Sequence, residues 1–123
     1  MRLGYVCLIT RDVPRLRDFY AMLLGRKPAA DRPDYVEFKL DGGAISMWSA
    51  ARHEREAPGS VALGRDRAVM IELEVDDPDA EHARLARAGV EIVKPPTTQE
   101  WGNRAVYVRD PDGNLVNLYR RVR

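Results

Sequence analysis

The sequence predicts an α+β fold in which the same order of elements occurs twice. The chain has 123 residues, enough for one domain that buries most of its apolar surface. Short runs of strand-forming residues alternate with two longer segments whose apolar residues recur at helical spacing. In each half the pattern predicts a strand, a helix and then two or three strands, and this repetition indicates an internal duplication.

In the first half, one helix is expected among three strands. Asp12 is a favourable N-cap, and Pro14 lies in the first turn, where proline is tolerated. Gly25 ends the run of apolar residues at helical spacing. A hairpin turn at residues 41–43 joins the last two strands. The predicted strands are residues 3–10, 35–40 and 44–49.

The second half follows a predicted linker. Residues 50–67 are polar and charged with no sustained period, so we expect a linker between module one, at about residues 1–50, and module two, at about residues 68–123. Asp77 is expected to begin a helix that Gly89 ends. The predicted strands of this half are residues 69–75, 91–94, 104–109 and 115–119.

Local matches support the duplication. Residues 9–12 stand where residues 74–77 stand later, because both lead from a strand into a helix that ends in glycine. In the second half, Pro95 and Pro96 are expected to end the short strand at residues 91–94, because proline cannot donate to a strand ladder.

Composition excludes several classes of protein. The formal net charge is +1 with no basic segment, so neither nucleic acid nor an anionic membrane is an expected partner. The N-terminal apolar run is too short to span a bilayer and lacks a cleavage site. Cys7 is the single cysteine, so no internal disulfide forms and a cytoplasmic location is expected.

Five short segments carry a resemblance to a known family: residues 11–12, 18–20, 24–25, 74–77 and 107–115. They resemble the vicinal-oxygen-chelate superfamily of glyoxalases, bleomycin-resistance proteins and extradiol dioxygenases. The resemblance covers nearly the whole chain and implies a single domain of two tandem βαβββ modules. Their strands would form a curled mixed sheet, a cup, with the helices packed outside. The Asp-Pro-Asp-Gly turn within the last segment is the most specific part.

The resemblance also implies where a divalent metal would bind. Family enzymes hold this metal in the cup with His, Glu or Gln from four strands. The four corresponding positions are Tyr5, a position near Ser46, Met70 and Asn117. None of these side chains is a good ligand for Fe, Mn, Ni or Zn. The two histidines, His53 in the linker and His82 on the second helix, lie outside the strands, so we expect no metal and no cofactor.

Strand alternation predicts which side chains line the cup. The predicted lining is rich in aromatic and sulfur-containing side chains, which favours a flat or amphipathic organic ligand. Ala105 and Leu115 are expected on the same face. The expected ligand-binding residues are Tyr5, Cys7, Phe38, Ser46, Trp48, Met70, Glu72, Trp101, Tyr107, Asn117 and Tyr119.

Each of these residues also has a purely structural interpretation. Trp48 and Trp101 would then fill a vestigial cup, and Tyr5 would belong to the core. Cys7 would be a small buried hydrophobic residue rather than a nucleophile. Glu72 is the one weak candidate for general acid or base catalysis; otherwise it pairs with an arginine or faces water.

Within the superfamily the chain is most similar to the metal-free bleomycin-resistance-type proteins. We therefore expect binding without turnover: a bacterial protein, homodimeric, that sequesters an aromatic natural product or antibiotic by mass action. One alternative is a lyase, isomerase or dioxygenase of the same superfamily, with a non-standard metal site or metal-free acid–base chemistry. Another is a structural partner domain whose cup is filled by its own side chains.

Overall fold

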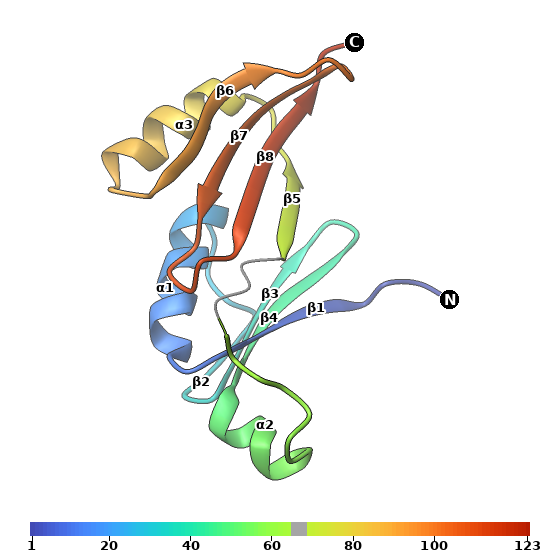
Figure 1. Ribbon diagram of the computed structural model, residues 1–123, viewed down its shortest axis with the longest axis vertical. Helices are drawn as coiled ribbons and strands as arrows, with labels where there is room; N and C mark the ends of the chain where they lie inside the picture. The colour runs from blue at the N-terminus through green and yellow to red at the C-terminus, as the bar shows by residue number, and fades with distance from the viewer. Residues whose placement is uncertain (65–68) are drawn as a thin grey trace. The chain divides into compact units, whose positions relative to one another are not determined.

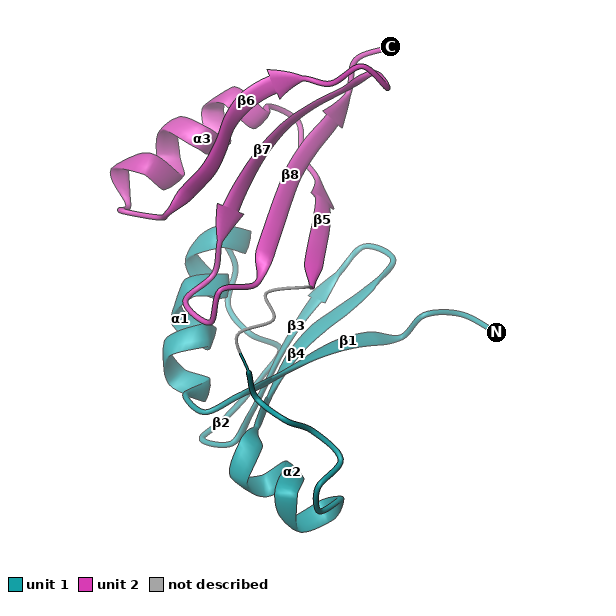
Figure 2. Cartoon of the chain, in the orientation of Figure 1, with its two compact units in different colours: residues 1–64 teal, residues 65–123 magenta. Residues whose placement is uncertain are grey.

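The chain forms two compact units, shown in Figure 2: unit 1 (Met1–Gly64) and unit 2 (Arg65–Arg123). The structure, a computed structural model, describes residues 1–64 and 69–123. Each unit contains a four-stranded mixed sheet, and the described residues form three helices. The predicted α+β class and tandem βαβββ arrangement are therefore confirmed. The boundary between the units lies within the predicted linker.

Unit 1 contains the first four strands and two helices (Figure 1). The strand order is β1-β4-β3-β2. Strand β1 runs parallel to β4, and the other neighbours are antiparallel. The elements are β1 (Tyr5–Thr10), α1 (Val13–Leu24), β2 (Ala30–Arg32), β3 (Tyr35–Leu40), β4 (Gly43–Ser49) and α2 (Ala50–Glu56).

Unit 2 repeats this topology with one helix. The strand order is β5-β8-β7-β6, and β5 runs parallel to β8 just as β1 runs parallel to β4. The elements are β5 (Met70–Glu74), α3 (Pro78–Arg87), β6 (Ile92–Thr98), β7 (Asn103–Arg109) and β8 (Leu115–Arg121). None of the helices in the described part of the chain is long and apolar enough to cross a membrane.

The helix caps show the duplication at atomic detail. Asp12 accepts a hydrogen bond from the backbone N–H of Arg15 at 3.1 Å. In unit 2, Asp77 accepts one from the backbone N–H of Ala80, also at 3.1 Å. Each acceptor satisfies an N–H that has no partner within its helix. The same cap therefore begins α1 and α3, as the sequence predicts.

Each unit packs one face of its sheet against its own helix. In unit 1, α1 contacts β3 and β4, and in unit 2, α3 contacts β6, β7 and β8. Leu16 and Tyr20 of α1 and Leu85 of α3 are fully buried. The buried apolar strand residues on the helix side are Leu8, Val36, Phe38, Ile45 and Met47 in unit 1, and Ile71, Val106, Val108, Val116 and Leu118 in unit 2. Ala105 of β7 is also buried but lies on the other face.

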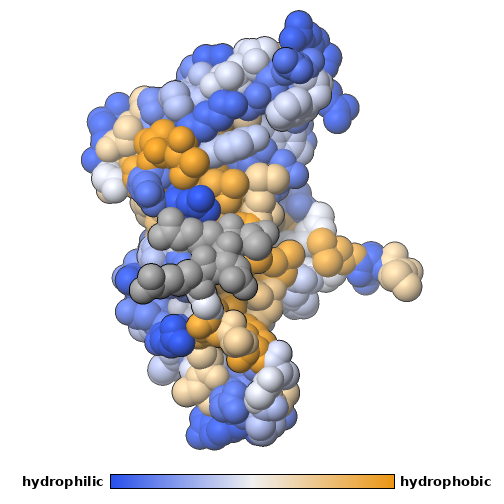
Figure 3. All heavy atoms as spheres, viewed as in Figure 1, coloured by the Kyte–Doolittle hydropathy of each residue, from blue (hydrophilic) through white to orange (hydrophobic). Residues whose placement is uncertain are grey.

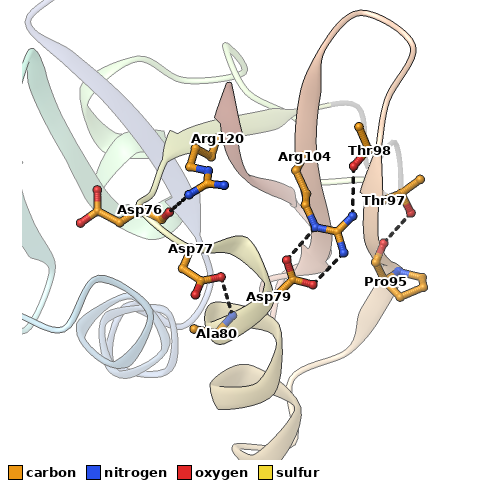
Figure 4. Close-up of polar contacts among 9 residues, drawn as sticks. All are labelled: Asp76, Asp77, Asp79, Ala80, Pro95, Thr97, Thr98, Arg104 and Arg120. Carbon is orange, nitrogen blue, oxygen red and sulfur yellow. Dashed lines mark hydrogen bonds and ion pairs between the residues drawn. The ribbon is translucent and has the colours of Figure 1, made fainter. Parts of the chain in front are cut away.

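An arginine links α3 to two strands of unit 2 (Figure 4). The guanidinium of Arg104 on β7 donates to both carboxylate oxygens of Asp79, at 2.6 and 2.8 Å, and to Thr98 Oγ1 at 3.1 Å. The hydrogen bond from Arg104 lowers the pKa of Asp79 below its ordinary value. A second arginine, Arg120, donates to the backbone carbonyl of Asp76 at 3.2 Å. These contacts fix the start of α3 on its sheet.

Three expectations about the elements are wrong. The predicted linker begins with helix α2, although its last part, residues 65–67, lies outside the described residues. Strand β6 continues through Pro95 and Pro96 to Thr98. It can do so because β6 is an edge strand with irregular register, where a missing N–H costs no ladder bond. The short strand β2 was not predicted.

Candidate functional site

Strand register defines one face of the unit 1 sheet, which we call the open face of unit 1. The β1–β4 register places Cys7 beside Ser46 and Ile9 beside Trp48, and the β3–β4 register places Glu37 beside Ser46. Cross-strand partners lie on the same face of a sheet, and residues two apart along a strand share that face. The open face of unit 1 consists of Tyr5, Cys7, Ile9, Ala30, Arg32, Tyr35, Glu37, Lys39, Ala44, Ser46 and Trp48.

A carboxylate with two phenol donors lies on this face. Tyr35 donates to Glu37 Oε2 at 2.9 Å, and Tyr5 donates to Glu37 Oε1 at 3.5 Å. Burial raises the pKa of the Tyr35 phenol above its ordinary value, and its hydrogen bond to Glu37 raises this pKa further. Tyr35 is therefore a protonated donor at neutral pH. Tyr5 is 53% exposed, so the Oε1 side of Glu37 faces a partly open surface.

Trp48 forms the aromatic part of the same face. Its ring meets the ring of Tyr35 edge to face, with 6.1 Å between the centroids. The guanidinium of Arg52, on α2, lies 5.4 Å from the centroid of Trp48. Arg52 is held there by Asp34, with 2.6 Å between the charged atoms. Trp48 is only partly buried, which leaves indole surface for a ligand.

One predicted site residue of unit 1, Phe38, differs from expectation. Phe38 pairs with Ile45 and is fully buried on the face that packs against α1, so its assignment to the ligand face is wrong. Cys7 lies on the open face as predicted, and it is exposed, so the alternative interpretation of Cys7 as a small buried hydrophobic residue is wrong. Hydrophobic side chains also lie at the surface of the N-terminal segment that leads into β1 (Figure 3).

The corresponding face of unit 2, its open face, follows from the β5–β8 and β7–β8 registers. Glu72 lies beside Asn117, and Tyr107 lies on the other side of Asn117. The predicted residues Met70, Glu72, Ala105, Tyr107, Leu115, Asn117 and Tyr119 therefore share one face, together with Glu74, Lys94, Thr97, Asn103 and Arg109. The alternation read from the sequence therefore put these residues of the second module on the same face as the structure does.

Asn117 and Glu72 form the polar centre of the unit 2 open face. Asn117 Nδ2 donates to Glu72 Oε2 at 2.8 Å. Asn117 is 4% exposed, and its Oδ1 atom has no hydrogen-bond partner among the described residues. A buried acceptor without a partner costs free energy, so this amide is suited to receiving a donor. Glu72 itself is exposed.

The remaining predicted residue, Trp101, lies in the loop between β6 and β7. Its side chain is 67% exposed. Gly102 follows at a φ of 99°, and a side chain at this position would meet the carbonyl oxygen of Arg123 at 2.6 Å. The backbone N–H groups of Val122 and Arg123 both donate to the Gly102 carbonyl. The C-terminus therefore fixes the loop that carries Trp101.

The four positions where the resemblance implies metal ligands occupy equivalent places in the two units. Tyr5 precedes the helix cap Asp12 by the same number of residues as Met70 precedes Asp77. Ser46 lies beside Cys7 as Asn117 lies beside Glu72. These four positions supply a phenol, a thioether, a hydroxyl and a carboxamide, a donor set that does not fit Fe, Mn, Ni or Zn. Within residues 1–64 and 69–123, no three His, Cys, Asp or Glu side chains are grouped to hold a metal ion.

This donor set predicts poor metal retention. After incubation with Fe, Mn, Ni or Zn and desalting, we expect less than about a tenth of an equivalent per chain, because a stable site needs several well-placed strong ligands. Elemental mass spectrometry of protein purified without chelator measures this directly. Retention near one equivalent would contradict the donor-set argument and would favour a metal enzyme.

Sequence reasoning missed two residues of the site, Tyr35 and Glu37. The signal that could have found them is the turn between β3 and β4. Leu40 pairs with Gly43, so the turn has two residues, Asp41 and Gly42, the Asp-Gly pair typical of tight hairpins. Counting back from a two-residue turn places Glu37 opposite Ser46, whereas the expected three-residue turn left the register of β3 open.

The chain is similar to known proteins over nearly its whole length. It is 28% identical to the uncharacterized protein YraH of Bacillus subtilis (strain 168) over 127 residues, 98% of each chain. A solved protein of unknown function from Agrobacterium tumefaciens str. C58 is 29% identical, with a TM-score of 0.80 over 99% of this chain and 95% of that chain.

A glyoxalase/bleomycin resistance protein/dioxygenase family enzyme from Burkholderia phytofirmans PsJN has a TM-score of 0.85. The alignment covers 99% of this chain and 100% of that chain at 19% identity, so this similarity shows the fold alone. Residues 2–118 match the Glyoxalase/Bleomycin resistance protein/Dioxygenase superfamily. The chain therefore belongs to this superfamily.

Proposed function

We propose that the protein binds an aromatic or amphipathic small molecule without a metal and without turnover. The observation that carries this proposal is that Tyr5, Ser46, Met70 and Asn117 stand at or near the four positions where the resemblance to the superfamily implies metal ligands. These side chains stack, pack and donate or accept hydrogen bonds. Such contacts suit recognition of an organic molecule, whereas metal-assisted chemistry needs an open coordination site.

The open faces supply the contacts that binding needs. On unit 1, Trp48 and Tyr35 form an aromatic surface beside Glu37. On unit 2, Tyr107 lies beside Asn117, whose Oδ1 atom has no hydrogen-bond partner within residues 1–64 and 69–123. Aromatic stacking contributes affinity, and a few polar groups fix the orientation of the ligand.

In the cell, such a protein would act by mass action. We propose that it sequesters a toxic or self-made aromatic compound away from its target, which requires tight affinity and enough protein but no catalytic residue. A homodimer is part of this proposal, since a groove shared by two chains would enclose more of a ligand. The exposed thiol of Cys7 is suited to a reducing compartment, and we propose the cytoplasm.

The proposal predicts saturable binding of three-ring aromatic probes. We choose 9-aminoacridine, anthracene-9-methanol and anthracene-9-carboxylate, which share a flat ring system and differ in charge. At least one is expected to bind with a Kd of about 1–10 μM, about 7–8 kcal/mol. Replacing Trp48 with leucine is expected to weaken that binding about tenfold or more, because stacking on an aromatic side chain contributes about 1–3 kcal/mol. Probe fluorescence anisotropy and calorimetry measure both.

The matched control is Phe19→Leu, which removes an aromatic ring from α1, outside the open face. Its affinity should equal that of the unmodified protein within about twofold, since it lacks the 1–3 kcal/mol loss. Failure of all three probes to bind would contradict the proposed function. Chromatography after long incubation should return each probe unchanged; its conversion to a product would favour the alternative, a lyase, isomerase or dioxygenase.

A further inference from the structure

We propose that the ligand carries a positive charge, a protonated amine or a guanidinium group, and that Glu37 binds it. The inference rests on the proposed function and narrows the chemical class of the ligand. The first observation concerns the groups that donate hydrogen bonds to Glu37. In the part of the chain that the structure describes, both of its donors are neutral phenols, those of Tyr5 and Tyr35.

A carboxylate with neutral donors keeps its negative charge uncompensated. The hydrogen bond from Tyr5 is long at 3.5 Å, so Glu37 Oε1 retains accepting capacity. A hydroxyl and a cationic donor both form charge-assisted hydrogen bonds with a carboxylate, but only the cation adds the attraction between opposite charges. A cationic donor arriving at Oε1 therefore gains more from Glu37 than a hydroxyl does.

The rings around Glu37 favour a cation as well. The face of an aromatic ring attracts positive charge. The structure already contains one such contact, since the Arg52 guanidinium lies 5.4 Å from the Trp48 centroid. Tyr35 meets the same indole edge to face. The carboxylate thus lies beside aromatic rings, one of which already binds a cation from the chain itself.

The basic residues nearby do not neutralise Glu37. Arg52 is paired with Asp34 at 2.6 Å. Lys39 and Arg32 share the open face by strand alternation, but both are exposed. No ion pair between either of them and Glu37 occurs among the described residues. Exposed charges are screened by water and salt and contribute little.

The open face of unit 2 also contains a carboxylate whose hydrogen-bond donor is neutral. Glu72 accepts a hydrogen bond from the neutral amide of Asn117 at 2.8 Å. The Asn117 Oδ1 atom lacks a hydrogen-bond partner in the part of the chain that the structure describes, and it can only accept a hydrogen bond. Both open faces thus present acceptors to a ligand, and a protonated amine or guanidinium, which only donates, satisfies them.

The charge series of probes tests this inference on the unmodified protein. At neutral pH, 9-aminoacridine is cationic, anthracene-9-methanol neutral and anthracene-9-carboxylate anionic. We expect the cation to bind about tenfold more tightly than the neutral probe, and the anion more weakly than either. Raising the salt from about 0.05 to 0.5 M should weaken binding of the cation more than that of the neutral probe.

The variant Glu37→Gln assigns the preference to one side chain. Its amide oxygen can still accept from Tyr35, and its NH2 group can donate to the Tyr5 hydroxyl oxygen. We therefore expect the fold to be kept, which circular dichroism checks. We expect about tenfold weaker binding of 9-aminoacridine and a change within about twofold for the neutral probe. The matched control Glu56→Gln removes the same charge from an exposed position on α2 and should leave both affinities unchanged.

The outcomes separate the two proposals. If no probe binds, the proposed function fails and the charge inference fails with it. If the probes bind with equal affinity, or the anion binds best, the proposed function stands and the inference is overturned. A cation preference that Glu37→Gln leaves intact overturns the assignment to Glu37, whereas loss of the preference in Glu37→Gln alone supports it.

Discussion

Replacing Phe38 with alanine is expected to lower the free energy of unfolding by about 3–5 kcal/mol. Phe38 is fully buried on the helix side of the unit 1 sheet, opposite Ile45. Truncating its ring removes apolar burial and leaves a cavity among side chains that relax only in part. Urea unfolding followed by circular dichroism measures the change. A loss of this size identifies Phe38 as a core residue.

Two further variants separate core from ligand face. Trp101→Ala changes a side chain that is mostly exposed, so its stability should change by no more than about 0.5 kcal/mol. Phe38→Leu keeps most of the apolar volume, and its affinity for the aromatic probes should stay within about twofold, because the residue faces away from the open face. If Phe38→Leu weakened probe binding as much as Trp48→Leu, the face assignment of Phe38 would be wrong.

Replacing Asp110 with alanine is expected to cost about 2–3 kcal/mol of stability. Asp110 is 4% exposed and lies in the turn between β7 and β8. Its Oδ1 atom accepts from the backbone N–H groups of Asp112 and Asn114, both at 2.9 Å, and Oδ2 accepts from the Asn114 side chain at 2.7 Å. Alanine leaves these donors without their acceptor. Thermal and urea unfolding report the loss.

The isosteric variant Asp110→Asn distinguishes the geometry of the turn from its charge. An amide oxygen in the Oδ1 position still accepts both backbone donors, so we expect a smaller loss, about 1 kcal/mol. Equal losses for alanine and asparagine would show that the negative charge, rather than the accepting oxygen, stabilises the turn. The turn joins the two central strands of unit 2, so its loss is also expected to weaken the register that places Tyr107 beside Asn117.

Strand alternation explains why most of the open faces could be predicted. Once one residue of a strand is placed, every second residue shares its face. The resemblance to the superfamily placed Tyr5, Met70 and Asn117, and alternation then placed Cys7, Glu72 and Tyr119. The register of both sheets agrees with these placements. The superfamily and the α+β class suggested by the same segments are confirmed.

Features that depend on local chemistry without apolar periodicity were harder to predict. Helix α2 has no buried residues, so it shows no apolar stripe; its one local signal is Ser49, which caps it by accepting from the backbone N–H of Arg52 at 3.3 Å. Tyr35 and Glu37 were missed because the length of one turn sets the register of β3. The exposure of Cys7 depends on the strand order of the sheet, which a single sequence does not show.

The separation of the two faces also bears on how such a protein diverges. In each unit the apolar side chains that pack against the helix lie on one side of the sheet, and the side chains proposed to bind a ligand lie on the other. A mutation that alters ligand choice therefore need not disturb packing. Along each strand, tolerance to substitution should rise and fall with a period of two residues. One inherited scaffold can in this way acquire new specificities by changing alternate residues, with little loss of stability at each step.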